Sequence, residues 1–387
     1  MPTPLTRGRS CIAKSCKKSA READRENWSN SIPMAASAIF IFGYMHCGTT
    51  LLQQILSKHP SIYCERKELK FIQLLARIRQ LYPDLTTPSK RLDYVAFCIF
   101  AIKNALKASS DLKGARIDIY RKEARAISIS SLDHLEIFFD VHKHLADTHH
   151  YWMDGSPNNA FYHREIRRLL PDAKFIIIVR DVRDVLASKK RRRDTTTPER
   201  YRHEKILEQK KLEKNYSCLT DSFSWKSTYA LCNFLSKNDS NTLLIRYEDL
   251  TREPVTTVRN LCEYLQIEYS DELIDVRFSN SADTSKRSPG IFVNSGQYRS
   301  YLSEAEIHVA QSITKNLLIS FEYPIETIST VARFNSIFPW LEFFPHLIQR
   351  TWNRYKLLGF WNFISFMKFN TKKLFGGLLG RTEIGKN

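Results

Sequence analysis

The chain has 387 residues, of which 43% are hydrophobic and 12% aromatic, so it can bury one large core. Its formal net charge of +18 indicates an anionic partner, such as an acidic sugar polymer, an anionic membrane surface or a nucleic acid. No apolar run approaches the roughly 18 residues that a membrane-spanning helix requires, so we expect none.

The first part of the chain, residues 1–34, is basic and polar and lacks the apolar centre of a leader peptide. We expect it to form a disordered arm. The eight cysteines contain no C-x2-C pair, and several lie in apolar runs, as Cys98 does. This usage favours reduced thiols and a cytoplasmic location.

A turn bounded by Gly43 and Gly48 follows a short apolar run that predicts a strand, and it precedes residues 51–58, whose apolar positions have helical spacing. Glycines allow a tight turn with inward-pointing amides, and the start of a helix adds unpaired N–H groups and the positive end of its dipole. Thr49 and Thr50 add hydroxyl donors. The turn is therefore predicted to hold a phosphate group, with an ordinary strand-turn-helix corner as the alternative.

The glycine spacing matches the first half of the nucleoside triphosphatase signature G-x4-G-K-S/T, but Thr49 stands at the lysine position. The segment Gly43-Tyr-Met-His-Cys-Gly-Thr-Thr50 resembles instead the loop G-x-x-K/R-S/T-G-T-T/S of sulfotransferases that use 3′-phosphoadenosine 5′-phosphosulfate (PAPS). His46 replaces the usual cation and Cys47 the usual hydroxyl residue. The resemblance implies that the nucleotide is bound by Gly43, His46, Cys47, Gly48, Thr49 and Thr50.

A second short strand is predicted near residues 61–64, and Glu68 follows it. Because ligands of α/β sheets bind at the carboxyl ends of strands, Glu68 is a candidate base. The segment Lys67-Glu-Leu-Lys-Phe71 resembles the K-E-x-H-F-F segment of the carbohydrate-sulfating branch, whose glutamate takes the proton of the acceptor hydroxyl. A solvated carboxylate in a charge cluster is the alternative.

Residues 82–145 have helical periodicity and are expected to form one wall of an acceptor cleft. The histidines in and after this stretch lack the partner spacing of a metal site, so we expect no metal. The next strand, residues 151–154, leads into Gly155, where the family often has D/E-K-S/T-P with a lysine that reaches the sulfuryl group. The usual cations are thus absent at His46 and Gly155 together.

The apolar run before Arg180 predicts a buried central strand, and Ser188 lies two turns into the following helix. An arginine fork and a hydroxyl can hold a phosphate from two sides. The pattern is similar to the family element R-D/N-P-x-D/R-x-x-x-S, which implies that Arg180 and Ser188 bind the 3′-phosphate. The cations of residues 189–193 form either a solvated face or a contact with an acidic acceptor or membrane.

Three further segments complete the resemblance. Residues 199–238 look helical, with Trp225 as a core residue or, alternatively, a contact to nucleotide or acceptor. Residues 241–254 are similar to R-Y-E-D-L-x-x-x-P, a packing element. Residues 294–303 resemble a loop that closes over the nucleotide, which implies contacts from Tyr298 and Arg299, while Lys286 and Arg287 are weaker candidates for the 3′-phosphate.

The predicted organisation has three parts. Residues 35–325 should form a P-loop-like α/β domain of three layers, with a central parallel sheet and helices on both faces. Residues 1–34 are the arm. Residues 326–387 mix aromatic and basic residues, which suits helices that lie in a membrane interface or pack on the domain or a second subunit.

The predicted function is transfer of a sulfuryl group from PAPS to a hydroxyl of a carbohydrate or glycolipid. Glu68 would act as the base, and loop donors with His46 would stabilise the departing phosphate, without a metal. One alternative is a small-molecule kinase, which the missing lysine disfavours. The other is a membrane-attached nucleotide-binding protein with impaired turnover. Nucleic acid is not expected as a partner, because no readout motif accompanies the charge.

Overall fold

The computed structural model describes residues 36–65, 68–104, 115–194, 216–276 and 290–341, with a few isolated positions besides. For residues 192–194 it describes the backbone alone. The predictions for the N-terminal arm, for Lys286 and Arg287, and for most of residues 342–387 lie outside the described residues.

The described strands form one parallel sheet of five strands in the order β2-β3-β1-β4-β5. They are β1 (Ser37–Gly43), β2 (Ile62–Tyr63), β3 (Tyr151–Asp154), β4 (Lys174–Val179) and β5 (Thr242–Arg246). In the register of the sheet, Phe40 lies opposite both Asp154 and Phe175. The segments that follow β1, β3 and β4 therefore leave the sheet side by side, at its carboxyl edge.

The central strand divides its side chains between two cores. Phe40 and Phe42 pack on one face with Phe175, whereas Ile39 and Ile41 pack on the other. All five residues are fully buried. A sheet covered on both faces needs apolar residues at successive positions, as parallel sheets do. The predicted α/β fold with a central parallel sheet and helices on both faces is confirmed.

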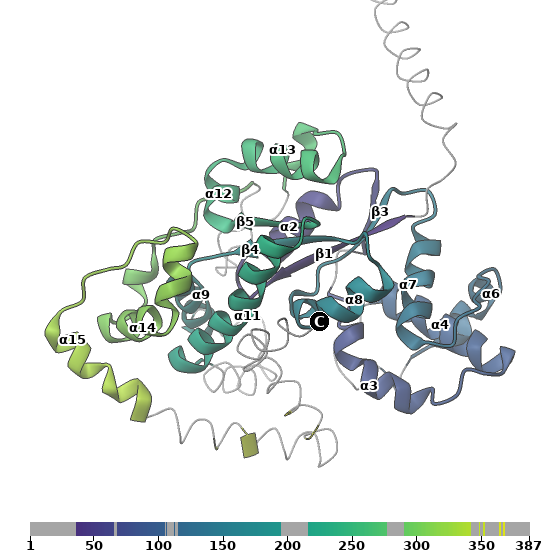
Figure 1. The fold of residues 1–387 in the computed structure, drawn as a ribbon, viewed down its shortest axis with the longest axis horizontal. Coiled ribbons are helices and arrows are strands. Elements are labelled where there is room, and N and C mark those ends of the chain that lie inside the picture. Colours follow the sequence, from purple (N-terminus) through teal and green to yellow (C-terminus); the bar gives the residue numbers. More distant parts are fainter. Residues whose placement is uncertain are drawn as a thin grey trace, which may run out of the picture.

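Helices cover the two faces and both ends of the sheet (Figure 1). They are α2 (Thr49–Leu56), α3 (Phe71–Leu81), α4 (Pro88–Asn104), α6 (Arg121–Ala124), α7 (His134–Leu145), α8 (His163–Leu169), α9 (Val182–Asp194), α11 (Cys218–Asn238), α12 (Tyr247–Arg252), α13 (Pro254–Leu265), α14 (Glu304–Ser320) and α15 (Thr330–Asn335). Short 3-10 turns are η1 (Ile117–Tyr120), η2 (Pro157–Tyr162), η4 (Asp271–Leu273) and η5 (Tyr298–Ser300).

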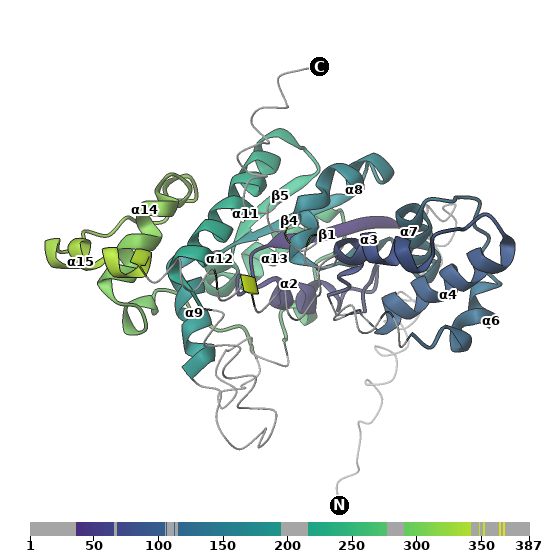
Figure 2. The same cartoon turned by 90° about the horizontal axis from the view of Figure 1, so that it is seen from below.

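The helices fall into groups on the faces and at the ends of the sheet. Helices α2, α12 and α13 pack on one face of the sheet, and α11 packs on the other. Figures 1 and 2 show α3, α4, α6 and α7 gathered beyond β3, with α14 and α15 at the opposite end. The helices predicted for residues 82–145 are confirmed as α4 and α7. They form one flank of the molecule.

A buried tyrosine of α11 holds the segment that follows β1. The hydroxyl of Tyr229 donates to the Ile178 carbonyl at 2.7 Å and accepts from the Tyr44 amide at 3.1 Å. The Tyr44 hydroxyl in turn donates to Asp221 at 3.1 Å, and Lys189 of α9 pairs with the same carboxylate. The turn after β1 is therefore fixed from β4, α9 and α11.

Replacing Tyr229 by Phe leaves the Tyr44 amide and the Ile178 carbonyl without their shared partner in a buried place. Because an unsatisfied buried group costs about 1–3 kcal/mol, the free energy of unfolding should fall by that amount. Urea denaturation followed by tryptophan fluorescence measures the change. Tyr264→Phe is the control, since the Tyr264 hydroxyl lies 3.5 Å from the Phe175 carbonyl, at the limit of a hydrogen bond. Equal losses in both variants would contradict the role of Tyr229.

Candidate active site

The turn between β1 and α2 has the geometry of an anion site. Gly48 is the N-cap of α2, with φ of 97° in the left-handed region. No described side chain caps the helix, and its first turn holds no acidic residue. The N–H groups of this turn and the positive end of the helix dipole are thus available to a phosphate. Thr50 is exposed beside them, whereas Thr49 is buried.

The two glycines of the turn are required by close neighbours. A Cβ on Gly48 would lie 2.4 Å from the ring of Tyr247, and one on Gly43 would lie 3.0 Å from the Ile178 carbonyl oxygen. Tyr247 and Ile178 both lie more than a hundred residues after the turn in the sequence. The segment predicted to be a packing element therefore packs, through Tyr247, on the phosphate loop itself.

Arg180 lies directly beside this turn. Its guanidinium lies 4.3 Å from the centre of the Tyr247 ring. One Nη donates to the His46 carbonyl at 3.1 Å, and the other donates to the Asn294 carbonyl. The buried Nε has no hydrogen-bond partner among the described residues. A buried N–H of a cation without an acceptor is costly, which makes an anion the natural ligand here.

Ser188 completes the same group of residues. Its hydroxyl lies 3.3 Å from Nδ1 of His46, which has a left-handed φ of 65°. The phosphate loop and the predicted 3′-phosphate residues are thus brought together, although they are far apart in the chain. The ring of His46 lies on the Ser188 side of the loop, and its contact with the departing phosphate stays a prediction.

Cys47 is a buried residue of the loop. Its side chain is fully buried, and its amide donates to the Tyr44 carbonyl at 3.2 Å. Burial raises the pKa of the Cys47 thiol to about 12, so the thiol stays protonated and neutral near pH 7. A nucleotide contact from Cys47 stays a prediction.

The candidate base is tied to the carboxyl end of β3. The hydroxyl of the buried Ser156 accepts from the amides of Leu69 and Lys70 at 3.0 and 3.3 Å. Glu68 precedes these amides, with a side chain 43% exposed and 4.0 Å from the Lys70 ammonium. The structure therefore places Glu68 near the carboxyl end of β3, the strand that pairs with β1, as a solvent-accessible carboxylate.

Asp154 is a second carboxylate at this place, and it has a structural role. It accepts from the Ser156 amide at 2.9 Å and from the Asn159 side chain at 2.8 Å. Burial raises the pKa of Asp154, and the nearby charge of Glu68 adds to the rise. In the family motif D/E-K-S/T-P, Asp154 stands at the acid position and Ser156 at the hydroxyl position, on either side of Gly155. The acid and hydroxyl at fixed spacing were the signal for this anchor.

The segment before α14 reaches the site through its backbone. Besides the Asn294 carbonyl on Arg180, the Gly296 amide donates to Asp184 at 2.7 Å. Tyr298 and Arg299 are both bound to Glu326, the latter by an ion pair of 3.0 Å. Their predicted contacts with the nucleotide stay predictions.

Other predicted groups have internal partners. Lys189 and Lys190 of the basic run pair with Asp221 and Glu306, so they are not simply a solvated face. Trp225 is buried, and its indole donates to the Arg180 carbonyl at 3.0 Å, which confirms its place in the core. In the described part of the chain, no group of three or more histidine, cysteine or acidic residues could hold a metal ion.

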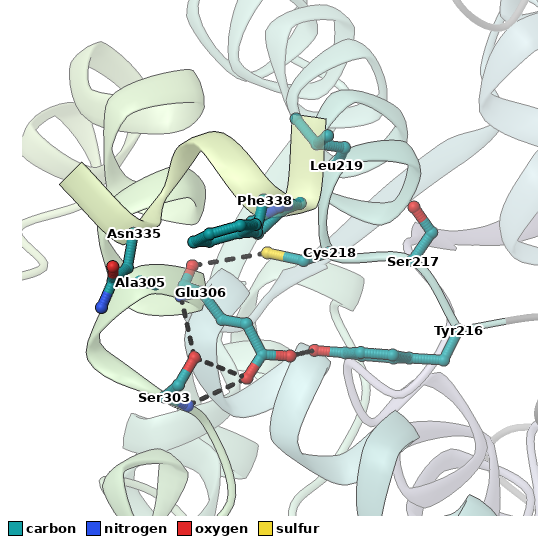
Figure 3. Close-up of a pocket in the computed structure, with 10 residues that line it drawn as sticks. Tyr216, Ser217, Cys218, Leu219, Ser303, Ala305, Glu306, Asn335 and Phe338 are labelled. Atoms are coloured by element: carbon teal, nitrogen blue, oxygen red, sulfur yellow. Dashed lines mark hydrogen bonds between the residues drawn. The ribbon is translucent and has the colours of Figure 1, made fainter. Parts of the chain in front are cut away.

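A cavity of about 450 Å³ shares no lining residue with this site (Figure 3). It lies between the first turns of α11 and α14 and the residues that follow α15, and its lining includes Cys218, Glu306 and Phe338. Glu306 accepts from Tyr216 at 2.7 Å and from the amide of Ser303 at 2.9 Å. Its carboxylate is thus already bound by the protein, and the cavity takes no part in the phosphate site.

Residues 38–271 match the family model described as the sulfotransferase family, which spans more than half of the chain. The chain belongs to the sulfotransferase family. Among curated protein sequences, none matches this sulfotransferase significantly. The resemblance stated from the phosphate loop and the Arg180 element is confirmed at the level of the family.

Several solved structures that are similar to this chain are sulfotransferases. The sulfotransferase domain of the Synechococcus PCC 7002 olefin synthase is 18% identical, with 77% of this chain and 98% of that chain covered and a TM-score of 0.49. A mouse sulfotransferase complexed with PAP (3′-phosphoadenosine 5′-phosphate) is 15% identical, with 79% of this chain and 90% of that chain covered and a TM-score of 0.36. A Mycobacterium avium sulfotransferase is 14% identical, with 80% and 82% covered and a TM-score of 0.41.

Gly48→Ala should damage the phosphate loop more than a matched glycine change does. Alanine in the left-handed region costs about 1–2 kcal/mol, and the displaced Tyr247 ring adds a further 1–3 kcal/mol, roughly. Gly296→Ala is the control, because Gly296 also has a positive φ, of 77°, but open space around its Cβ position. Urea unfolding compares the two. A loss at Gly48 no larger than at Gly296 would show that Tyr247 does not confine the loop.

Proposed function

We propose that this sulfotransferase transfers the sulfuryl group of PAPS to a hydroxyl of a carbohydrate or glycolipid acceptor. The observation that carries the proposal is the meeting of two anion-binding elements. Arg180 and Ser188 contact the His46 carbonyl and ring at 3.1 and 3.3 Å, directly beside the free first turn of α2. A nucleotide with a 5′- and a 3′-phosphate fits two such neighbouring sites.

The transfer needs a base for the acceptor hydroxyl. In the proposed step, the acceptor oxygen forms a bond to sulfur while the bond from sulfur to the 5′-phosphate oxygen breaks. Glu68 takes the hydroxyl proton, and 3′-phosphoadenosine 5′-phosphate (PAP) departs with the bonding electrons. The amides of the α2 first turn and Thr50 stabilise the charge that gathers on the departing phosphate. The exposure of Glu68 and its tether to Ser156 support this role.

A carbohydrate or glycolipid acceptor is supported by the segment around Glu68. This segment resembles that of the carbohydrate-sulfating branch, and it leads directly into α3. Helices α3, α4 and α7 lie together beyond β3 (Figure 2). The acceptor therefore approaches Glu68 along this flank in our proposal.

Titration calorimetry with PAP tests the nucleotide site. Arg180→Ala removes hydrogen bonds to a charged group, each worth about 1.5–3 kcal/mol, so we expect PAP affinity to fall roughly 10- to 150-fold. ATP with magnesium should give no heat. Binding of ATP instead of PAP would favour the kinase alternative, and absence of both would contradict the nucleotide site.

Turnover of labelled PAPS with an acceptor panel tests the base in the same preparation. Glu68→Gln should lower turnover about 10²- to 10⁴-fold and leave PAP affinity unchanged. Glu65→Gln, on the same segment, is the control and should keep full turnover. Tight PAP binding without turnover of the unaltered protein would favour the non-catalytic alternative, which the absent cations at His46 and Gly155 suggest.

We also propose that the end of the described chain lies on an anionic membrane surface. Its large apolar side chains are exposed, and they include Val331, Phe334, Ile337, Phe338, Trp340 and Leu341. The sequence that follows supplies cations at Arg350, Arg354, Lys356, Lys368, Lys372 and Lys373. Apolar and aromatic residues with nearby cations, on a chain of net charge +18, suit an anionic bilayer surface. None of the described helices has the length and apolarity to cross a bilayer.

Vesicle sedimentation tests the membrane surface. The protein should bind phosphatidylglycerol-containing vesicles more tightly than pure phosphatidylcholine vesicles, and salt should weaken the binding. Phe334 is 77% exposed, so it can enter the bilayer surface. Phe334→Asp should therefore weaken vesicle binding about tenfold or more, because the variant lacks the aromatic side chain that would be buried in the bilayer. Val255→Asp, on α13, is the control. Binding unaffected by Phe334→Asp, or concentration-dependent dimerisation in its place, would contradict the proposal.

A further inference from the structure

Gln53 of α2 has a buried amide without a partner. The residue is 3% exposed, the same value as its helix neighbour Leu51. Its Nε2 makes no hydrogen bond to any described residue. A leucine would suit such a position if packing were its only role. A buried donor without an acceptor is unfavourable and calls for an explanation, which a ligand oxygen would supply.

The Gln53 amide occupies the place where a side chain of residue 155 would begin. A Cβ built on Gly155 would lie 1.8 Å from Nε2 of Gln53 and 2.0 Å from its Cδ. No side chain at position 155 fits while Gln53 holds this conformation. Gly155 and Gln53 therefore form a matched pair, in which the absence of one side chain makes room for the other.

The surroundings of this pair belong to the active site. Gln53 lies on the helix whose first turn is the proposed phosphate site. Gly155 lies between Asp154 and Ser156, and Ser156 holds the segment that carries Glu68. The amide thus lies at Gly155, between the helix that carries the proposed phosphate site and the residue, Ser156, that holds the Glu68 segment.

We propose that Gln53 donates a hydrogen bond from Nε2 to an oxygen of the sulfuryl group during transfer. This inference rests on the proposed function. Gln53 keeps its proton throughout, because the new bond forms between the acceptor oxygen and sulfur and the hydroxyl proton goes to Glu68. The residue supplies a neutral donor at the place where a side chain from position 155 is absent.

The test compares Gln53→Leu with the adjacent control Gln54→Leu, by turnover and by affinity for PAPS and PAP. PAP lacks the sulfuryl group, so it should bind Gln53→Leu within about twofold of the unaltered protein. Turnover should fall about 10²-fold, as for loss of one donor to a developing charge, and PAPS affinity should fall relative to PAP. A purely structural role would change PAP and PAPS affinity together. Unchanged turnover in Gln53→Leu would overturn the inference.

A second variant keeps the test decisive if Gln53→Leu folds poorly. Gln53→Ala vacates the space, and Gly155→Lys in the same chain places an ammonium group there. The double variant should turn over at least about tenfold faster than Gln53→Ala alone. Gly155→Lys alone should lose turnover, because its side chain clashes with Gln53. No recovery would contradict a shared donor position. Absence of PAP binding and turnover in the unaltered protein would instead contradict the proposed function, and this inference with it.

Discussion

The hydroxyl of Tyr229 satisfies two backbone groups at once, and the positions of both phosphate-binding elements depend on α11, which carries it. A buried hydroxyl must use its donor and acceptor capacity. Tyr229 does so with the Ile178 carbonyl and the Tyr44 amide, at the ends of β4 and β1. Its ring packs 4.7 Å from Trp225, whose indole holds the Arg180 carbonyl. One helix therefore sets the separation between the loop and the arginine.

The fold was predictable because its signals are local. The central strands are apolar runs rich in β-branched and aromatic residues, and glycine and helical spacing follow β1 immediately. Two phosphate-binding motifs in the expected order then indicated the family. Helical periodicity predicts Trp225 of α11 as a core residue, but periodicity cannot name the partners of this helix. Tyr229 meets Tyr44 across 185 residues of sequence.

Parts of the site could not be predicted because they depend on contacts between residues that are distant in the sequence. Gly155 was interpreted as a lost lysine, whereas the structure fills its space with the side chain of Gln53. Tyr247 was assigned to packing, and its contact with Gly48 and Arg180 appears only once β5 is placed beside β4. Glu68 was found from its place after a strand, but its tether to Ser156 depends on the pairing of β2 with β3.

The main-chain carbonyl groups that accept hydrogen bonds from Arg180 affect the affinity of this residue for a ligand. The guanidinium donates hydrogen bonds to the main chain of the loop at His46 and of the segment at Asn294. These neutral oxygens are weaker acceptors than a phosphate, yet a phosphate that uses the same N–H groups must displace them. Measured affinity is then the difference between two sets of hydrogen bonds. A ligand that takes these N–H groups therefore competes with the Asn294 carbonyl, so ligand occupancy of the arginine and this contact are thermodynamically linked.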